Sequence, residues 1–181
     1  MRTLALRSDL AGSSDGAIFF GMTDTSPTAA VLLIGDELLS GRTRDINLQQ
    51  IAGYLAPLGI PVRETRIVPD VEEEIVDAVN ALRNKYTYVF TTGGIGPTHD
   101  DITAESIAAA FGVPLELNDE AYAELLSYYK DENEITESRK KMAMIPRGAK
   151  LVENPVSGAP GIHIENVETR NYNGDGISWQ I

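Results

Sequence analysis

The chain has 181 residues, 43% of them hydrophobic, which is enough for one domain with a sizeable core. Its formal net charge of −12 argues against a broad nucleic-acid-binding face, because neutralising phosphates requires clustered Lys and Arg. Cysteine is absent, so disulfides and thiolate chemistry are excluded, and a zinc ion could be held only by histidines and carboxylates.

Residues 1–28 differ in character from the rest of the chain. Two arginines precede a patch of Gly, Ser and Asp and a short apolar cluster at 17–20, without the continuous apolar centre of a secretion signal. No apolar run approaches the roughly 20 residues of a membrane-spanning helix. We therefore expect a cytoplasmic protein with no membrane partner, in which 1–28 form a disordered leader and Met22 is an alternative start.

From residue 29 onward, short apolar runs alternate with amphipathic stretches. The apolar runs predict strands over 29–34, 60–68, 86–92, 113–117, 150–153 and 161–165. Apolar residues at helical spacing predict helices over 45–58, around 75–82, and over 103–110, 118–129 and 138–144. Alternating strands and helices at this rhythm indicate βαβ units. We predict an α/β fold of three layers, with helices on both faces of a mainly parallel, mixed sheet.

Several helix ends carry recognisable signals. Gly59 and Gly112 follow the last apolar position of their helices and predict a stop there. Asp70 with Glu73 resembles a capping pair, and Thr103 can cap the helix that follows it. We place one domain at 29–167, because the segment 168–181 is polar, rich in Gly and Asn, and shows no clear period.

Two polar loops follow the ends of predicted strands. The first runs from Gly35 to Gly41, and the second contains three glycines followed by His99, Asp100 and Asp101. In open parallel sheets, ligands bind beyond the carboxyl ends of the strands. If strands 29–34 and 86–92 are neighbours, the acidic residues of both loops gather at one edge of the sheet.

The glycines of the second loop suggest a phosphate site. Gly93, Gly94 and Gly96 would let the backbone approach a ligand closely and point successive amides at a phosphate. Carboxylates beside a phosphate imply a divalent cation, since like charges would otherwise repel, and magnesium suits oxygen ligands. The sequence therefore predicts a small-molecule site with a metal ion.

Simpler interpretations remain open for each feature. Gly93 and Gly94 could form a tight exit from the strand. The carboxylates of Asp36 and Glu37 could only stabilise a helix amino end. Asp45 and Asn47 could cap and position a helix without touching a ligand, and His99 could be an ordinary surface histidine.

The residues of the two loops carry a family resemblance. The stretches 31–41 and 92–103, with Asp45-x-Asn47 between them, resemble the MoaB/Mog molybdopterin-binding domain family over about 29–167. The His99-Asp100-Asp101 sequence and the later Asn154-Pro155-x5-Pro160-Gly161 are most similar to the CinA amino-terminal branch and to the comparable domain of eukaryotic FAD synthases. The resemblance implies a homo-oligomer, either a dimer or a trimer.

The resemblance implies one of two activities. Members similar to MogA transfer AMP from ATP to molybdopterin with magnesium, and members similar to CinA hydrolyse pyrophosphate bonds in ADP-ribose or related dinucleotides. The adenylyltransferase pattern carries Gly-Gly-Thr-Gly and a later Arg-Asp pair, whereas this chain has Ile95 and His99-Asp100-Asp101. We therefore expect a CinA-like nucleotide pyrophosphatase, with molybdopterin adenylylation and a non-catalytic molybdopterin- or nucleotide-binding module as the alternatives.

Site roles follow from the resemblance together with the loop chemistry. Asp36, Asp100 and Asp101 are the expected catalytic residues, and Asp36, Glu37 and Asp101 the expected metal ligands, for Mg²⁺ or, in its place, Mn²⁺ or Co²⁺, with potassium in some members. The expected ligand-binding residues, for a nucleotide or a pterin, are Gly35, Glu37, Ser40, Gly41, Asp45, Asn47, Thr92, Gly93, Gly94, Ile95, Gly96, Pro97, Thr98, His99 and Thr103.

The end of the chain departs from the family pattern. Related sequences continue past the position of Asn166-Val167 with an apolar strand and a Gly-(Val/Ile)-Pro turn, where this chain has the polar stretch 168–174. We hypothesise that the chain is truncated or read out of frame near residue 167, which would impair its activity.

Overall fold

The computed structural model describes residues 26–129, 131, 134–152, 154, 159–165 and 177–180. Most of the leader predicted for 1–28, the Pro155 position and most of the segment 168–181 lie outside these described residues. Among the described residues, no helix combines the length and the apolar character needed to cross a membrane.

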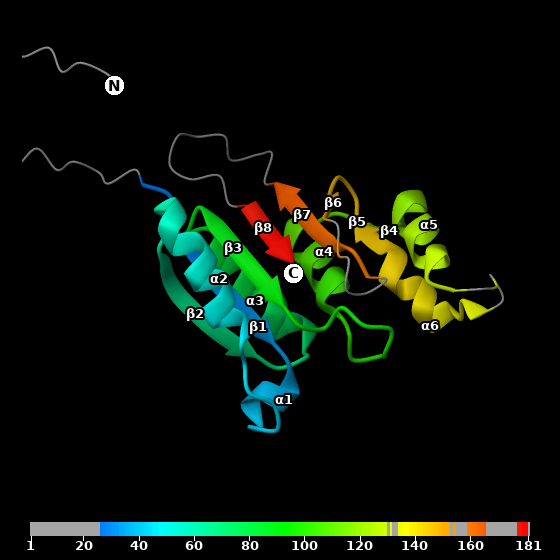
Figure 1. Ribbon diagram of the computed structural model, residues 1–181, viewed down its shortest axis with the longest axis horizontal. Helices are drawn as coiled ribbons and strands as arrows, with labels where there is room; N and C mark the ends of the chain where they lie inside the picture. Colours follow the sequence, from blue (N-terminus) through cyan, green and yellow to red (C-terminus); the bar gives the residue numbers. More distant parts are fainter. Residues whose placement is uncertain are drawn as a thin grey trace, which may run out of the picture.

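A six-stranded sheet forms the centre of the fold, with the order β2-β1-β3-β8-β7-β6. Its strands are β1 (Ala29–Ile34), β2 (Val62–Val68), β3 (Tyr88–Thr92), β6 (Lys150–Val152), β7 (Gly161–Glu165) and β8 (Ile177–Gln180). β1 pairs in parallel with β2 and β3, and β3 with β8, whereas β7 runs antiparallel to both of its neighbours. Figure 1 shows this mixed sheet with helices on its two faces, which confirms the predicted α/β fold.

The helices are mostly short. They are α1 (Asp36–Leu39), α2 (Asn47–Leu55), α3 (Glu72–Arg83), α4 (Thr103–Phe111), α5 (Asp119–Ser127) and α6 (Glu137–Lys140), with 3-10 turns η1 (Ala56–Leu58) and η3 (Lys141–Ala143). A second, two-stranded antiparallel sheet pairs β4 (Leu115–Leu117) with β5 (Met144–Pro146). This small sheet lies beside α5 and α6, away from α2 (Figure 1).

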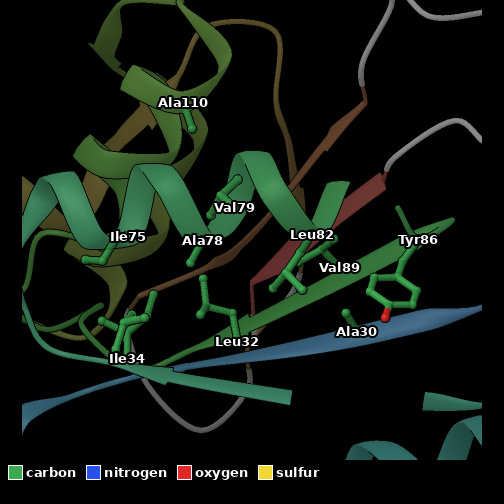
Figure 2. Packing of buried hydrophobic residues seen from close by; sticks show 11 residues of the cluster. Ala30, Leu32, Ile34, Ile75, Ala78, Val79, Leu82, Tyr86, Val89 and Ala110 are labelled. Carbon is green, nitrogen blue, oxygen red and sulfur yellow. The ribbon is translucent and has the colours of Figure 1, made fainter. Parts of the chain in front are cut away.

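β1 explains how the layers hold together, because all six of its residues are buried. Ala30, Leu32 and Ile34 pack against α3 in one cluster, as Figure 2 shows, while Val31 and Leu33 pack against α2 in another. Successive side chains of a strand point to opposite faces, so a continuous apolar run requires cover on both sides. Burying each of the larger side chains contributes about 1.5–3 kcal/mol to stability.

A third apolar cluster joins the small sheet to the main one. Ile107 of α4 and Leu125 of α5 are fully buried against Ile145 of β5 and against Ile162 and Ile164 of β7. α5, β5 and β7 are thereby fixed next to α4, which is the helix that follows the second polar loop.

Some element boundaries differ from the sequence predictions. The strand predicted to start at residue 60 starts at Val62, because the Ile60 N–H still bonds to the Leu55 carbonyl at the end of the preceding helix. The strand predicted over 86–92 starts at Tyr88 for the same kind of reason, since the Tyr86 N–H bonds to the Leu82 carbonyl. In both cases the first residues of the predicted strand still donate backbone hydrogen bonds to the preceding helix.

Two elements were predicted incorrectly. The helix expected over 138–144 is divided into α6 and η3 and gives way at Met144 to β5, because Met144 pairs with Leu117 across the small sheet. The polar segment 168–181, for which the sequence predicts no element, contains β8, which lies between β3 and β7. In each case a partner strand distant in sequence determines the structure.

Candidate functional site

The two polar loops meet because of one strand pairing. β1 and β3 are parallel neighbours, with Leu33 opposite Thr92, so the loops that follow them leave the same edge of the sheet. β2 also ends at this edge, with Val68 opposite Ile34, and it brings Asp70 to the same place. The expectation that both loops share one edge is therefore correct, and the structure adds a third loop to them.

The first loop begins with a tight turn at Gly35. The Gly35 N–H donates to the Val68 carbonyl, with an N to O distance of 3.1 Å, and its φ is 155°. A Cβ at this position would lie 2.5 Å from Glu37 Oε1, so the space is already taken by that carboxylate. The following residues form the single turn α1, which places Asp36 on the surface and leaves Glu37 half-buried.

The rest of the first loop is held by its own hydrogen bonds. The Ser40 hydroxyl donates to the Glu37 carbonyl at 3.3 Å and accepts from Arg42 Nε at 3.0 Å. Gly41 is exposed and has a φ of 72°, which favours glycine. Ser40 and Gly41 thus shape the loop, and their predicted contact with a ligand remains a prediction.

Asp45 and Asn47 connect the first loop to β3. The Asp45 carboxylate accepts the backbone N–H groups of Asn47 and Leu48, the first two residues of α2, at 3.0 and 3.1 Å, although the N-cap position of α2 is Ile46. The Asn47 side-chain amide donates to Thr92 Oγ1 at 2.7 Å. Asp45 therefore holds the first turn of α2, and Asn47 fixes α2 against the start of the second loop.

Two glycines at the start of the second loop occupy backbone conformations that favour glycine. Gly93 has a φ of 102°, and a Cβ there would collide with the Ile34 carbonyl oxygen. Gly94 has a φ of 62°, and a Cβ there would collide with Thr103 Oγ1 and lie 3.5 Å from Asp70 Oδ1. These glycines are required by close packing against the ends of β1 and α4, which also brings the loop backbone next to Asp70.

Thr103 closes the second loop at its base. Its N–H donates to the Gly94 carbonyl at 3.2 Å, and its hydroxyl donates to the Gly93 carbonyl at 2.8 Å. The residue is fully buried and is the first residue of α4, whose N-cap position is occupied by Ile102. The predicted capping role is therefore wrong, because the hydroxyl bonds to the loop and does not cap the helix.

The tip of the loop is organised by Asp101. Oδ2 of Asp101 accepts the Thr98 N–H at 2.8 Å and also bonds to the Thr98 hydroxyl, while the Asp101 N–H donates to the Thr98 carbonyl. A Cβ at Gly96 would lie 2.7 Å from the same oxygen. Pro97 and His99 are exposed at the tip, and the His99 side chain retains 99% of its accessible surface.

Asp70 is a site residue that the sequence analysis did not identify. It was interpreted as one member of a capping pair with Glu73, but α3 has Val71 at its N-cap and receives no side-chain cap. The Asp70 carboxylate instead accepts the Asp36 N–H at 3.0 Å. Its position directly after a predicted strand was the signal that could have identified it, since both other site loops occupy that position.

Negative charge is concentrated around Asp70. Burial raises the pKa of the Asp70 carboxyl, and the charges of Glu37, Asp36 and Asp100 raise it further, against the opposing effect of the Asp36 N–H. The pKa of Asp100 is lowered, first by the Thr98 hydroxyl and then by its own backbone N–H, with smaller effects from His99 and Lys141. Three carboxylates from the two other loops thus act on the Asp70 carboxyl at this edge.

The carboxylate oxygens at this edge are of the kind that binds a divalent cation, but they are spaced too widely to hold one as they stand. Carboxylate oxygens are the ligands that magnesium prefers, and crowded carboxylates are relieved by a cation. Within the described part of the chain, no three Asp, Glu, His or Cys side chains come close enough together to hold a metal ion. The metal set Asp36, Glu37 and Asp101 therefore remains a prediction.

A groove of about 590 Å³ lies along α2 and β3. Its walls are mainly apolar and aromatic, including Tyr54, Tyr88 and Phe90, and it reaches the site only through Asn47 and Thr92. None of the described residues that line it carries a carboxylate. The carboxylates that could act on a phosphate ligand therefore lie at the loops and not along this groove.

A smaller cleft lies on the other side of the second loop. It is lined by Gly94, Ile95 and Gly96, by Asp101, and across from them by residues of η3, β5 and β7. This cleft brings the loop backbone and Asp101 against the small sheet, so a ligand on the glycine loop would also contact residues far along the chain.

Comparisons with known proteins agree with the geometry. The family described as "Probable molybdopterin binding domain" matches residues 30–174. A protein of Sulfurisphaera tokodaii is 47% identical over 138 residues, which are 75% of this chain and 52% of that protein. A protein of Pyrobaculum calidifontis is 44% identical over 140 residues, or 77% of this chain and 53% of that protein. The chain thus spans about half the length of these curated relatives.

Two solved structures are also similar. The protein CinA of Thermoplasma acidophilum, described as having unknown function, is 32% identical with a TM-score of 0.76, and the match covers 86% of this chain and 89% of that one. The tungsten cofactor synthesizing protein MoaB of Pyrococcus furiosus is 20% identical with a TM-score of 0.53, and the match covers 86% and 81%. The second likeness shows the fold alone.

Proposed function

The chain belongs to the MoaB/Mog molybdopterin-binding domain family, and from this premise we propose that it hydrolyses the pyrophosphate bond of a nucleotide such as ADP-ribose or FAD. The observation that carries the proposal is the parallel pairing of β1 with β3, which brings the glycines of the second loop and the carboxylates of both loops to one edge of the sheet. The likeness to CinA supports this branch over the adenylyltransferases, as do Ile95 and the His99-Asp100-Asp101 sequence.

Phosphate binding is assigned to the second loop. The backbone amides around Gly94 and Gly96 lie beside the amino end of α4, where the partial positive charge of a helix favours an anion. The hydrogen bonds of Thr103 to both Gly93 and Gly94 hold this backbone in place before a ligand arrives. Binding therefore requires little further ordering of the loop.

In the proposed reaction, a water oxygen attacks one phosphorus of the pyrophosphate and the bond from that phosphorus to the bridging oxygen breaks. AMP and a second phosphate ester are released, and the proton lost by the water passes to a carboxylate. We assign the proton to Oδ1 of Asp101, because Oδ2 is held by Thr98 and thereby fixes the orientation of the group.

The other acidic residues have supporting roles. Asp36, Glu37 and Asp101 would hold a Mg²⁺, Mn²⁺ or Co²⁺ ion if they moved closer together than they lie in this structure, and the bound ion would offset the negative charge of the phosphates. Asp70 holds the Asp36 backbone through its hydrogen bond, and Asp100 adds negative charge at the same edge. Asn47 maintains the spacing between the two loops through Thr92.

One panel of incubations tests the proposal. The protein is mixed with Mg²⁺, Mn²⁺ or Co²⁺ and with ADP-ribose, FAD, NADH, or ATP plus molybdopterin, and AMP and adenylylated pterin are measured. AMP from ADP-ribose or FAD without pterin is the expected result. Product that requires molybdopterin would assign the adenylyltransferase instead, and ligand binding with no turnover would assign a binding module.

A further inference from the structure

We infer that Lys141 contacts the phosphate of the bound nucleotide across the small cleft, and that Glu105 competes with this phosphate for the Lys141 ammonium group. The inference rests on the proposed function, because it assumes that the nucleotide binds with its phosphates at the second loop. It adds a cationic residue from η3, more than thirty residues after the second loop, to a site otherwise built from glycines and carboxylates.

The position of Lys141 carries the inference. The cleft has Gly94, Ile95 and Gly96 on one wall and Lys141 on the other. Of the described residues that line it, Lys141 is the one with a Lys or Arg side chain. η3 is fixed there by the fully buried Ala143, which packs in the same apolar cluster as Ile107 of α4.

The ion pair of Lys141 shows where its charge lies. Nζ is 3.3 Å from Oε1 of Glu105, a residue in the first turn of α4 directly behind the loop. The Lys141 side chain is 25% exposed and that of Glu105 is 39% exposed, so the pair is only partly in water.

The charge balance of the protein gives Lys141 its importance. With a net charge of −12 and several carboxylates at the site edge, an anionic ligand is repelled as it approaches. A partly desolvated ammonium interacts more strongly with a phosphate than an exposed one, because water screens it less. The lysine ammonium group binds phosphate as a point charge. Unlike the planar arginine guanidinium, it needs no fixed orientation, so it can exchange a carboxylate partner for a phosphate oxygen.

Substitution at three positions separates this role from a structural one. Lys141→Met removes the charge and keeps much of the length, Lys141→Arg keeps the charge, and Lys140→Met removes the neighbouring charge, which does not line the cleft. Glu105→Gln removes the competing carboxylate. Affinities for AMP, inorganic pyrophosphate and uncharged adenosine are measured by calorimetry on each full-length variant, with thermal unfolding as the check on folding.

Lys141→Met is expected to weaken binding of AMP and pyrophosphate about tenfold or more, with little change for adenosine, because a hydrogen bond to a charged group is lost. Lys141→Arg should restore most of the affinity, and Glu105→Gln should tighten binding of AMP. Added salt should weaken AMP binding less in Lys141→Met than in the parent protein.

Equal AMP affinity in Lys141→Met and Lys140→Met would overturn the inference, and so would a parent protein that binds neither AMP nor pyrophosphate. If Lys141→Met does not fold, Glu105→Gln decides, since unchanged AMP binding in that variant also contradicts the competition. A parent protein that binds AMP through Lys141 but releases none from ADP-ribose or FAD would refute the proposed hydrolysis and leave this inference intact.

Discussion

The backbone N–H of Asp36 donates to the Asp70 carboxylate, with an N to Oδ2 distance of 3.0 Å. This bond joins the loop after β1 to the loop after β2, so the first polar loop is held from outside itself. It also crowds Asp70 against Asp36 and Glu37, whose charges raise the Asp70 pKa in addition to the effect of burial. The site therefore combines a stabilising hydrogen bond with a repulsion between carboxylates.

Two substitutions at Asp70 separate these effects. Asp70→Ala removes the acceptor of the Asp36 N–H and should reduce the free energy of unfolding by about 0.5–1.5 kcal/mol. Asp70→Asn keeps an acceptor and removes the repelling charge, so it should be at least as stable as the parent protein at neutral pH. Urea unfolding measures both. If Asp70→Asn is less stable than the parent protein at neutral pH, the repulsion between the carboxylates is not significant.

Asp101→Asn tests the assigned proton acceptor. The variant should lower turnover of ADP-ribose or FAD by about 100-fold or more, which is typical for loss of a general base. Its stability should change little, because the asparagine carbonyl can still accept from Thr98. Asp77→Asn, on the exposed surface of α3, is the matched control and should leave AMP release unchanged. Normal turnover by Asp101→Asn would remove Asp101 from its role.

Gly94→Ala tests the packing of the second loop. Gly94 and Gly112 have nearly the same φ, at 62° and 64°, but a Cβ at Gly112 meets nothing within 4 Å, whereas one at Gly94 collides with Thr103 Oγ1. Gly112→Ala should cost about 1–2 kcal/mol through the left-handed backbone alone. Gly94→Ala should cost more and should also abolish nucleotide binding, measured by calorimetry. Equal effects of the two substitutions would mean that the loop tolerates the clash.

Leu32→Ala tests the core that supports the site. Leu32 is 0% exposed in β1 and packs under α3, as Figure 2 shows, so its truncation should cost about 2–5 kcal/mol of unfolding free energy. Ile67→Ala on β2 removes a similar side chain that is 46% exposed, and it should cost much less. Urea denaturation of the two variants compares them directly, and similar losses would contradict the burial of Leu32 beneath α3.

Glu64 provides a pH-dependent test far from the loops. Bonds from Lys85, Tyr86 and Arg66 lower its pKa to about 2 from the ordinary value of 4.5. A lowered pKa in the folded state means that the stability from this group is present above pH 4.5 and is lost as the pH falls toward 2. Glu64→Gln should therefore be less stable than the parent protein at neutral pH, with the difference shrinking as the pH falls toward 2.

Thermal unfolding of both proteins across this pH range measures the effect. Glu74→Gln, an exposed carboxylate on α3, serves as a control and should show no comparable difference. A stability difference between Glu64→Gln and the parent protein that does not depend on pH would show that the contribution comes from packing and not from the charge of Glu64.

The sequence alone determined the local features of this protein. The apolar run 29–34 and the apolar spacing in 48–55 and 75–82 predict their elements because burial on one or two faces imposes a period on neighbouring residues. The two loop motifs were sufficient to indicate the family, which the match over 30–174 confirms. These features all depend on residues close together in the chain.

Only the tertiary structure determined how distant segments combine. Met144 belongs to a strand because Leu117 pairs with it, and residues 177–180 belong to the main sheet because β3 and β7 lie on either side of them. The Asp70 carboxylate bonds to the Asp36 N–H and does not cap α3, and Lys141 lies across the small cleft from the second loop. Such contacts are selected by the free energy of the whole fold, and no local period in the sequence records them.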